Sequence, residues 1–332
     1  MIRLVQLQRT SGERRVGIVK GSTLKTLTRF SSTYDLVNAA VSEACPLPAF
    51  LLGEQTEEEI DYDAVYVAKS KWRLLPPIDH PNEQSRCLIT GTGLTHMASA
   101  EKRRAMHGDA APENDSIRMY RWGVKGGRPS PGTVGAPPEW FYKGTGAILR
   151  AHGEPLRVPS FAEDAGEEAE VAGVYFIDAQ SQPRRIGMAV GNEFADHQFE
   201  RRSYLYLAAS KLRQCALGPE LVLDSPFDDI HGRVKIERAG AVVWSTSLAT
   251  GQANMSHSLA NIEHHHFKFA EHRRPGDVHI HFYGADAFSF GEGVGLEEGD
   301  TVEIAFSDFG RPLRNSIQFE PRSDALTVIL PA

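Results

Sequence analysis

Two short acidic segments hold the residues best suited to chemistry. Glu168 and Glu170 stand at the start of the apolar run Val171–Tyr175, a pattern typical of a buried strand. Residues i and i+2 of a strand point the same way, so the two carboxylates should project together. They repel each other unless a cation lies between them, and oxygen-only ligands select a hard divalent ion such as Mg²⁺ or Mn²⁺. An acidic strand end is also commonly a solvated edge, so this segment by itself leaves both interpretations open.

A second apolar strand carries a further carboxylate. Ile186–Val190 runs directly into Gly191-Asn192-Glu193, which puts Glu193 at the exit of the strand. The helix-like stretch that follows includes Lys211. Taken alone, this lysine is typical of the exposed face of an amphipathic helix.

The elements that must position these residues are mostly strands. After residue 77, short apolar runs bounded by glycine and proline predict strands at 86–90, 171–177, 185–190, 220–223, 232–238, 241–247, 278–282 and 301–306, and two segments, 203–212 and 256–271, have a helical pattern. This alternation favours a β-rich barrel or sandwich over a doubly wound sheet. The Gly/Pro-rich run 126–138 is predicted to be a surface loop, either an active-site lid or a connector.

The first part of the chain predicts a separate small unit. A hairpin is expected over residues 1–20, a helix over 33–43 with Ser32 or Thr33 as its cap, and a strand over 72–77 that ends at prolines. We expect a small N-terminal α/β domain at 1–76 and a main domain at 77–332.

The composition narrows the class of protein. The 332 residues include 36 Lys and Arg against 43 Asp and Glu, a net charge of −7, and this mild acidity argues against a nucleic-acid partner. No apolar stretch approaches the ~20 residues of a membrane span, and residues 1–15 do not resemble a signal peptide. Three cysteines without a CxxC pair indicate a reducing, cytoplasmic setting.

Several blocks, in order, resemble the fumarylacetoacetate hydrolase superfamily. They are Glu139–Lys143, Glu168-Ala169-Glu170, Gly191-Asn192-Glu193, Ser210-Lys211 with Leu217-Gly218-Pro219, Arg274–Val278, Leu296–Val302 and Gly310–Asn315. Glu193 stands where that family usually has Asp. Two further blocks, Phe199–Ser203 and Asn254-Met255-Ser256, are similar to the branch of 2-keto-3-deoxy-sugar-acid dehydratases. His197 stands where the diketo-acid hydrolases of the family have arginine, which weakens a hydrolase assignment.

The resemblance implies a β-rich α+β fold, with a fumarylacetoacetase C-terminal-like pseudo-barrel, in a homodimer with one divalent cation, Mg²⁺ or Mn²⁺, per site. By position it implies Glu168, Glu170 and Glu193 as metal ligands and Lys211 as the active-site lysine. Lys143 and His197 are expected to contact the substrate.

The segment Gly91–His96 resembles another family block with one residue missing. The backbone N–H groups around Thr92 and Gly93 are expected to hold a substrate carboxylate, as small nests do. His96 is a candidate acid or base because its ordinary pKa suits proton transfer near neutrality. Glu101 lies five residues beyond His96 and not three as in the hydrolases, so the water-activating pair of those enzymes is doubtful.

We therefore expect a metal-dependent dehydratase that converts a 2-keto-3-deoxy sugar acid, a pentonate, to 2-oxoglutarate semialdehyde. The alternatives are hydrolysis of the C–C bond of a 2,4-diketo acid and a non-catalytic sugar-acid-binding module. The run His264–His266 is predicted to be a solvated helix face, whereas His279 and His281 alternate along a strand and suit either a cavity wall or a packed core.

Overall fold

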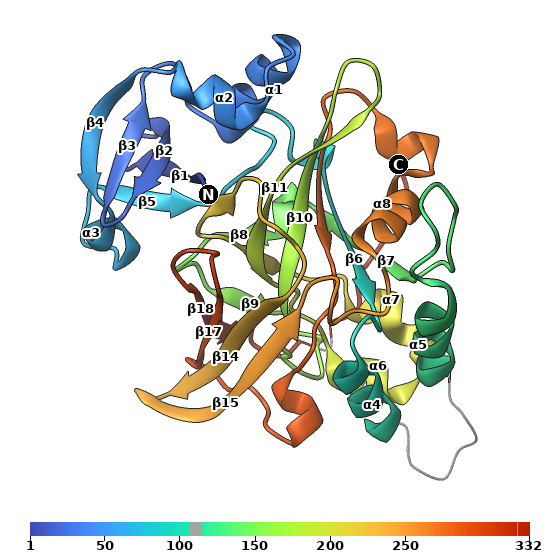
Figure 1. The fold of residues 1–332 in the computed structure, drawn as a ribbon. Helices are drawn as coiled ribbons and strands as arrows, with labels where there is room; N and C mark the ends of the chain where they lie inside the picture. The colour runs from blue at the N-terminus through green and yellow to red at the C-terminus, as the bar shows by residue number, and fades with distance from the viewer. Residues whose placement is uncertain (107–114, 324) are drawn as a thin grey trace.

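The computed structural model describes residues 1–106, 115–323 and 325–332. Its N-terminal part is a curved antiparallel sheet covered by short helices (Figure 1). The elements are β1 (Arg3–Arg9), β2 (Arg14–Lys20), β3 (Thr23–Leu27), α1 (Thr33–Ser42), α2 (Leu47–Leu52), β4 (Thr56–Asp61), α3 (Tyr62–Tyr66) and β5 (Trp72–Leu75). The predicted hairpin, helix and strand are confirmed here, and the Ser32 side chain caps α1 by accepting a hydrogen bond from the Asp35 amide.

The N-terminal strands continue into a larger mixed sheet. Its further strands are β6 (Cys87–Gly93), β7 (Glu139–Thr145), β8 (Leu149–Arg150), β10 (Ala169–Ile177), β11 (Pro183–Asn192), β12 (Cys215–Leu217), β13 (Leu221–Val222) and β16 (Val278–Phe282). Strand β1 pairs with β13, and β6 and β7 form the far end of the sheet. Apolar residues from both sides of position 76, such as Leu4, Leu36, Cys87 and Ile280, share one core, so the first 76 residues fold against the remainder.

A second sheet packs against this one. It consists of β9 (Leu156–Val158), β14 (Ile230–Arg238), β15 (Ala241–Thr250), β17 (Thr301–Phe306) and β18 (Leu313–Phe319). Val171 and Val190 of the first sheet share a core with Val234 and Ile304 of the second. The β-rich α+β fold that the family resemblance implies is therefore confirmed.

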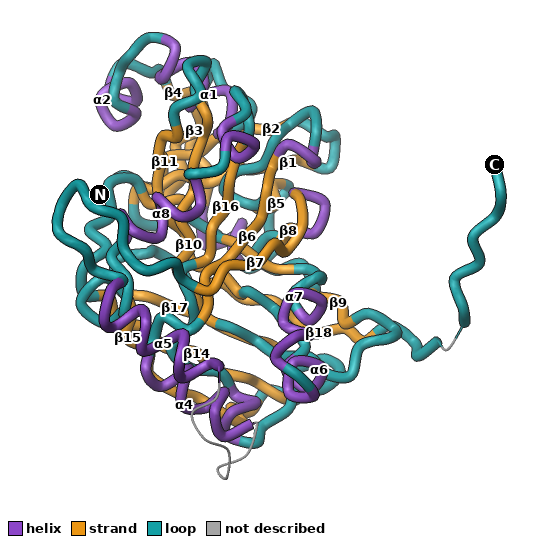
Figure 2. The backbone as a smooth tube through the Cα atoms, turned by 90° about the vertical axis from the view of Figure 1, so that its right-hand side faces the viewer, coloured by secondary structure: helices purple, strands orange, loops and turns teal. Residues whose placement is uncertain are grey.

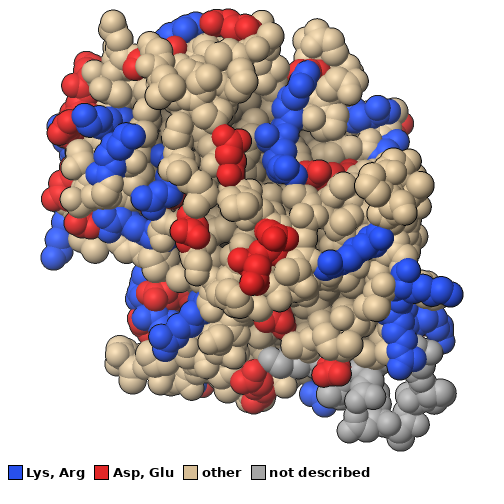
Figure 3. All heavy atoms as spheres, in the orientation of Figure 1, with Lys and Arg blue, Asp and Glu red and all other residues tan. Residues whose placement is uncertain are grey.

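The helices are short and lie around the sheets (Figure 2). They are α4 (Met97–Met106), α5 (Asp115–Gly126), α6 (His197–Arg202), α7 (Leu207–Ser210) and α8 (Leu259–Phe267), with 3₁₀ turns η1 (Gln84–Arg86), η2 (Gly146–Ile148), η3 (Tyr204–Tyr206), η4 (Ala270–Arg273) and η5 (Ser289–Glu292). The sequence did not predict α4 and α5, and the helix expected over 203–212 is divided into η3 and α7. Among the described helices, none combines the length and the apolar character that a membrane crossing requires. On the face drawn in Figure 3, basic and acidic side chains are interspersed.

Candidate active site

Three buried carboxylates converge where β10 begins and β11 ends. The strands are antiparallel, with Ala169 opposite Asn192 and Glu170 opposite Gly191, so the start of one lies beside the end of the other. One carboxylate oxygen from each of Glu168, Glu170 and Glu193 lies within 4.8 Å of the other two. The structure thus brings together the three glutamates that the sequence singled out, and they do not form a solvated edge.

Hydrogen bonds from backbone amides of distant segments hold the residues around the three carboxylates in place. The Glu193 amide donates to the Glu168 carbonyl at 2.9 Å, and the Glu168 amide donates to Asn192 Oδ1 at 3.2 Å. The Gly284 amide donates to Glu170 Oε2 at 2.7 Å. Gly284 has a φ of +105°, and an added Cβ there would lie 2.0 Å from Thr95 Oγ1, so both the conformation and the space require glycine.

The electrostatics of the cluster favour a bound cation. Burial, followed by the charges of Glu193 and Glu168, raises the pKa of Glu170 well above its ordinary value. Burial also raises the pKa of Glu193, against the opposing effect of two lysines. A divalent ion among the three oxygens would stabilise the ionised carboxylates, and an all-oxygen donor set fits Mg²⁺ or Mn²⁺.

Lys211 lies against the carboxylates and not on a solvated face. It is the C-cap residue that follows α7, and its Nζ lies 2.5 Å from Glu168 Oε1 and 2.6 Å from Glu193 Oε2. The same Nζ lies 5.1 Å from the centre of the Phe141 ring, a cation–π distance. The ammonium group is therefore positioned to offset negative charge at the site.

Lys143 comes from β7 and is fully buried. Its Nζ pairs with Glu193 Oε1 at 2.5 Å and donates to the carbonyls of Phe194 at 2.6 Å and Lys211 at 2.9 Å. An ammonium group has three N–H donors, and protein atoms use all three. The expected substrate contact of Lys143 would require it to give up one of these bonds.

His197, at the start of α6, holds Glu168 from the other side. Its Nε2 lies 2.9 Å from Glu168 Oε1, and its ring packs on Phe288 and Phe290. Burial lowers the pKa of His197, but the hydrogen bond and charge of Glu168 outweigh it, so the net shift is upward. Its Nδ1 has no hydrogen-bond partner among the described residues. The contacts observed for His197 thus join it to a carboxylate of the cluster.

Glu139 is a site residue that the sequence analysis did not single out. Glu139, Phe141 and Lys143 alternate along β7 and are buried, while the residues between them are exposed. Since Phe141 and Lys143 contact the site, Glu139 faces the same side. The Tyr204 hydroxyl donates to Glu139 Oε1 at 2.5 Å. Glu139 lies two residues before Phe141 and four before Lys143, so the alternation of a strand places all three on one face. This spacing is the signal that could have identified Glu139.

The segment Gly91–His96 lies beside these groups. On β6, a Cβ at Gly93 would lie 1.7 Å from Glu139 Oε2, and one at Gly91 would lie 2.4 Å from the Phe141 ring. The two glycines therefore make room for the side chains of β7. The Thr92 hydroxyl bonds to His281 Nε2 at 2.7 Å, so the side chain is engaged by His281, and the backbone is the part of Thr92 expected to contact a substrate carboxylate.

His96 is buried, and its ring is held by two hydroxyl groups. Nδ1 lies 2.9 Å from Thr95 Oγ1, and Nε2 lies 3.1 Å from Thr250 Oγ1. Burial lowers the pKa of His96 to about 4. Because both ring nitrogens are engaged by threonines, His96 does not form a pair with Glu101.

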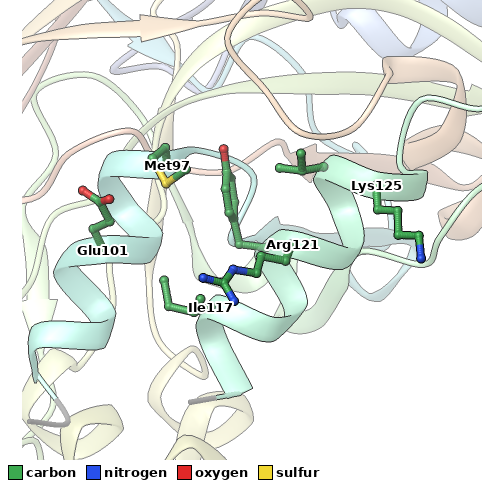
Figure 4. Close-up of a pocket in the computed structure, with 7 residues that line it drawn as sticks. Met97, Glu101, Ile117, Arg121 and Lys125 are labelled. Atoms are coloured by element: carbon green, nitrogen blue, oxygen red, sulfur yellow. The ribbon is translucent and has the colours of Figure 1, made fainter. Parts of the chain in front are cut away.

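Directly after His96, α4 and α5 form a helical pair with a pocket between them (Figure 4). The pocket is lined by Met97 and Glu101 of α4 and by residues of α5 that include Ile117, Arg121 and Lys125. In the close-up, the Arg121 side chain extends from α5 toward α4. Charged and apolar groups thus meet in this pocket, and its α4 wall begins directly after His96.

The prediction for the histidine run is wrong for two of its three residues. His264 is exposed, but His265 and His266 are buried. His266 Nε2 lies 2.9 Å from His279 Nδ1, and Trp140 donates to His266 Nδ1 at 3.2 Å. The α8 helix packs His266 onto the sheet, where the imidazoles bond to one another and to Trp140. His265 lies against the loop of Gly135, whose carbonyl is 3.0 Å from His265 Nε2.

The comparisons with known proteins agree with the motifs. No protein-family model matches the chain. A curated relative, 2-dehydro-3-deoxy-D-arabinonate dehydratase of Saccharolobus solfataricus, is 28% identical over 178 residues, which span 52% of this chain and 56% of the relative. The match thus covers about half of the relative's length.

Solved structures match over nearly the whole chain. A 2-keto-3-deoxyarabinonate dehydratase has a TM-score of 0.73 at 21% identity, covering 96% of this chain and 99% of its own. A 2-keto-3-deoxy-D-arabinonate dehydratase described as complexed with magnesium and 2,5-dioxopentanoate has a TM-score of 0.72 at 20% identity, with coverages of 97% and 100%. A 2-hydroxyhepta-2,4-diene-1,7-dioate isomerase from Mycobacterium marinum follows at a TM-score of 0.60 and 16% identity, with coverages of 97% and 100%. The chain therefore has the fold of the 2-keto-3-deoxyarabinonate dehydratases, and the resemblance predicted from its motifs is confirmed.

Proposed function

We propose that this protein is a metal-dependent hydro-lyase that removes water from a 2-keto-3-deoxy sugar acid, most simply a pentonate. The observation that carries the proposal is the buried cluster of Glu168, Glu170 and Glu193, with one oxygen of each within 4.8 Å of the others. The similarity to dehydratases in both comparisons supports it. One of those structures is described with 2,5-dioxopentanoate, which is 2-oxoglutarate semialdehyde, the compound left when a 2-keto-3-deoxypentonate loses water.

Glu168, Glu170 and Glu193 are proposed to hold Mg²⁺ or Mn²⁺. When bound, the ion would polarise the keto group of a 2-keto acid and so acidify the hydrogens on C3. His197 keeps Glu168 oriented through its 2.9 Å contact, and Lys143 does the same for Glu193. We assign Lys143 this positioning role in place of the substrate contact expected from the sequence.

Lys211 and Glu139 are proposed to act on the substrate. Lys211 touches two carboxylates, so its contacts favour a cation that stabilises developing negative charge over a base. Glu139 is then the candidate to take the proton from C3 and to return it to the C4 hydroxyl, which leaves as water. Tyr204, which donates to Glu139, keeps that carboxylate in place. Loss of water leaves a C3–C4 double bond conjugated with the keto group. Transfer of a proton from C5 to C3 then gives the enol of the C5 aldehyde, which tautomerises to the keto aldehyde.

The contacts of His96 weigh against hydrolysis of a 2,4-diketo acid. That reaction needs a histidine and a carboxylate that together activate a water molecule. Both ring nitrogens of His96 are bonded to threonine hydroxyls, and burial keeps the ring neutral by lowering its pKa to about 4. We therefore propose that His96 positions the loop that carries Thr92 and Gly93.

We also infer a reducing, cytoplasmic compartment. Cys45, Cys87 and Cys215 are all free, and burial raises the pKa of the Cys215 thiol to about 12. Free cysteines, two of them buried, suit a compartment in which disulfides are rare.

The direct test is product analysis. The protein with Mg²⁺ is incubated with a panel of 2-keto-3-deoxy pentonates and hexonates and with acylpyruvates, and semialdehyde and pyruvate are quantified. Semialdehyde formation that stops when the metal is chelated is the expected result. Pyruvate released from acylpyruvates would show the hydrolase instead, and saturable binding of a sugar acid without turnover would show a binding module.

A further inference from the structure

The loop at residues 163–166 runs beside the segment that leads into α6. The backbones of Gly166 and Ala195 exchange two hydrogen bonds, of 3.0 and 2.9 Å. Arg213 adds a second attachment, because its Nη1 donates to the Asp164 carbonyl at 2.8 Å and to the Ala195 carbonyl at 3.0 Å. The backbone of this loop is therefore held in place without any contribution from the Asp164 carboxylate.

The imidazole of His197, the first residue of α6, lies between this loop and the carboxylate cluster. Its Nε2 lies 2.9 Å from Glu168 Oε1, and its ring centre lies 4.8 and 5.4 Å from those of Phe288 and Phe290. A Cβ added at Gly166 would lie 2.2 Å from Nδ1 of the imidazole. The Nδ1 atom thus faces the loop, and a glycine at position 166 permits this close approach.

Two buried polar atoms at this place lack a hydrogen-bond partner within the part of the chain that the structure describes. They are His197 Nδ1 and Asp164 Oδ2. Burial raises the pKa of Asp164, and the charge of His197 is the first of several effects that oppose this rise, so the two groups lie within reach of each other's charge. Buried polar atoms without partners cost free energy, and a hydrogen bond, direct or through a buried water molecule, removes that cost.

We propose that Asp164 is a positioning residue of the metal centre. Its carboxylate bonds to His197 Nδ1, directly or through one water molecule, and thereby fixes the imidazole that orients Glu168. The inference rests on the proposed function, because Glu168 is one of the three assigned metal ligands. Groups that hydrogen-bond to metal ligands set the orientation of those ligands and so affect the affinity for the metal. Asp164 acts one step further out, through His197.

The bond to Asp164 restricts the orientation of the His197 ring. An imidazole can turn by half a rotation, which exchanges the positions of its nitrogen and carbon atoms and would put a carbon against Glu168 Oε1. A second bond, made at Nδ1, favours the orientation in which Nε2 meets the carboxylate. Glu168 then keeps the position from which it can bind a metal ion together with Glu170 and Glu193.

The test is the dissociation constant for Mn²⁺, measured without substrate by electron paramagnetic resonance of the free ion. Asp164→Ala and the nearly isosteric Asp164→Leu should each weaken binding roughly 3–10-fold, and His197→Phe should weaken it up to about 100-fold. The matched control is Glu163→Ala, since Glu163 lies in the same loop but pairs with Arg202 at 2.8 Å. This control should bind Mn²⁺ within about twofold of the wild type. Thermal unfolding shows which variants are folded, and the two Asp164 substitutions keep the test valid if one misfolds.

A double variant separates positioning from a general effect on the fold. Asp164→Ala combined with His197→Phe should bind Mn²⁺ as weakly as His197→Phe alone, because Asp164 then has no imidazole to hold. Asp164→Asn keeps a side chain that can form hydrogen bonds, so it should restore most of the affinity that Asp164→Ala loses.

Four outcomes would overturn the proposal. Unchanged Mn²⁺ affinity in the folded Asp164 variants would do so while leaving the metal site intact. Additive losses in the double variant would show that Asp164 acts independently of His197, and an equal loss in Glu163→Ala would show that any change in the loop has the same effect. A wild type that binds no Mn²⁺ would overturn the metal site as well, and product analysis then decides separately whether the protein is a dehydratase.

Discussion

Two buried polar clusters, the carboxylates and the histidines, lie on opposite faces of the same sheet. They differ in how burial of their polar groups is compensated. Along β10, Glu170 points to one face of the sheet, whereas Gly173 and Tyr175 point to the other. Gly173 lies opposite His281 of β16, and Tyr175 lies opposite His279. The carboxylates and the histidines therefore face opposite ways. Burial raises the pKa of Glu170 and lowers the pKa of His279 to about 3, which in both cases favours the neutral form.

The two clusters differ in what surrounds the polar atoms. In the first cluster Lys143 pairs with Glu193, and Lys211 pairs with Glu168 and Glu193, so ammonium groups favour the charged form of these two carboxylates. The histidines bond to one another, to Trp140 and to threonine hydroxyls, and they remain neutral without any ion. A buried cluster that retains charge is where a cation and a polarised substrate can be accommodated, whereas the neutral cluster serves packing.

The largest effect on this contrast is expected from Glu170→Gln in the carboxylate cluster. The change keeps the shape but removes one charge and one strong ligand, so we expect turnover to fall by at least about a thousandfold, equivalent to several kcal/mol of lost metal-ion stabilisation. Turnover of the 2-keto-3-deoxy pentonate is the measurement, and thermal unfolding followed by circular dichroism is the control for the fold. Full, chelator-resistant activity in this variant would contradict the assignment of the carboxylate cluster.

The second effect concerns the ion pairs. Lys143→Met leaves Glu193 buried with one partner fewer, so we expect the free energy of unfolding to fall by about 3–5 kcal/mol, as measured in urea. The matched control is Lys235→Met, because Lys235 pairs with Glu237 and Glu303 at the surface. That pair should contribute no more than about 1 kcal/mol. Equal losses in the two variants would show that the buried lysine has no special role.

The third effect is the pH dependence of the histidine cluster. The folded pKa values of His279 and His281 are about 3, below the ordinary 6.5, so the unfolded chain binds more protons between these values. Their contribution to stability is therefore present above pH 6.5 and is lost as the pH falls toward 3. Each histidine contributes a slope of about 1.4 kcal/mol per pH unit. His279→Gln should make the slope of unfolding free energy between pH 6 and 4 shallower, and an unchanged slope would count against this account.

The smallest effect is expected from substitutions of Thr92 and Thr90, whose influence on KM distinguishes the two residues. Their hydroxyls hold the two ring nitrogens of His281, each at 2.7 Å. Thr92→Val and Thr90→Val should each cost about 1–3 kcal/mol of stability, because a buried nitrogen loses its partner. KM should stay the same in both variants if substrate meets only the backbone of Thr92. A rise in KM confined to Thr92→Val would place the Thr92 hydroxyl at the substrate.

Local patterns in the sequence were enough for the strands and drew attention to the carboxylates at their ends, and the family resemblance then implied that these carboxylates are metal ligands. The apolar runs after Glu170 and before Glu193 indicated two buried strands, because period and burial are written into neighbouring residues. The hairpin of residues 1–20 and the cap of α1 followed for the same reason. The motifs then indicated the family resemblance and three acidic ligands.

The tertiary structure alone decided which partners those residues have. Only the antiparallel register of β10 and β11 places Glu193 beside Glu168, and only the pairing of β6 with β7 puts Glu139 next to Gly93. The burial of His266 and the use of all three donors of Lys143 likewise depend on residues far away in the chain. Contacts between distant segments determine the charge state and the role of a side chain, and no local pattern of residues records them.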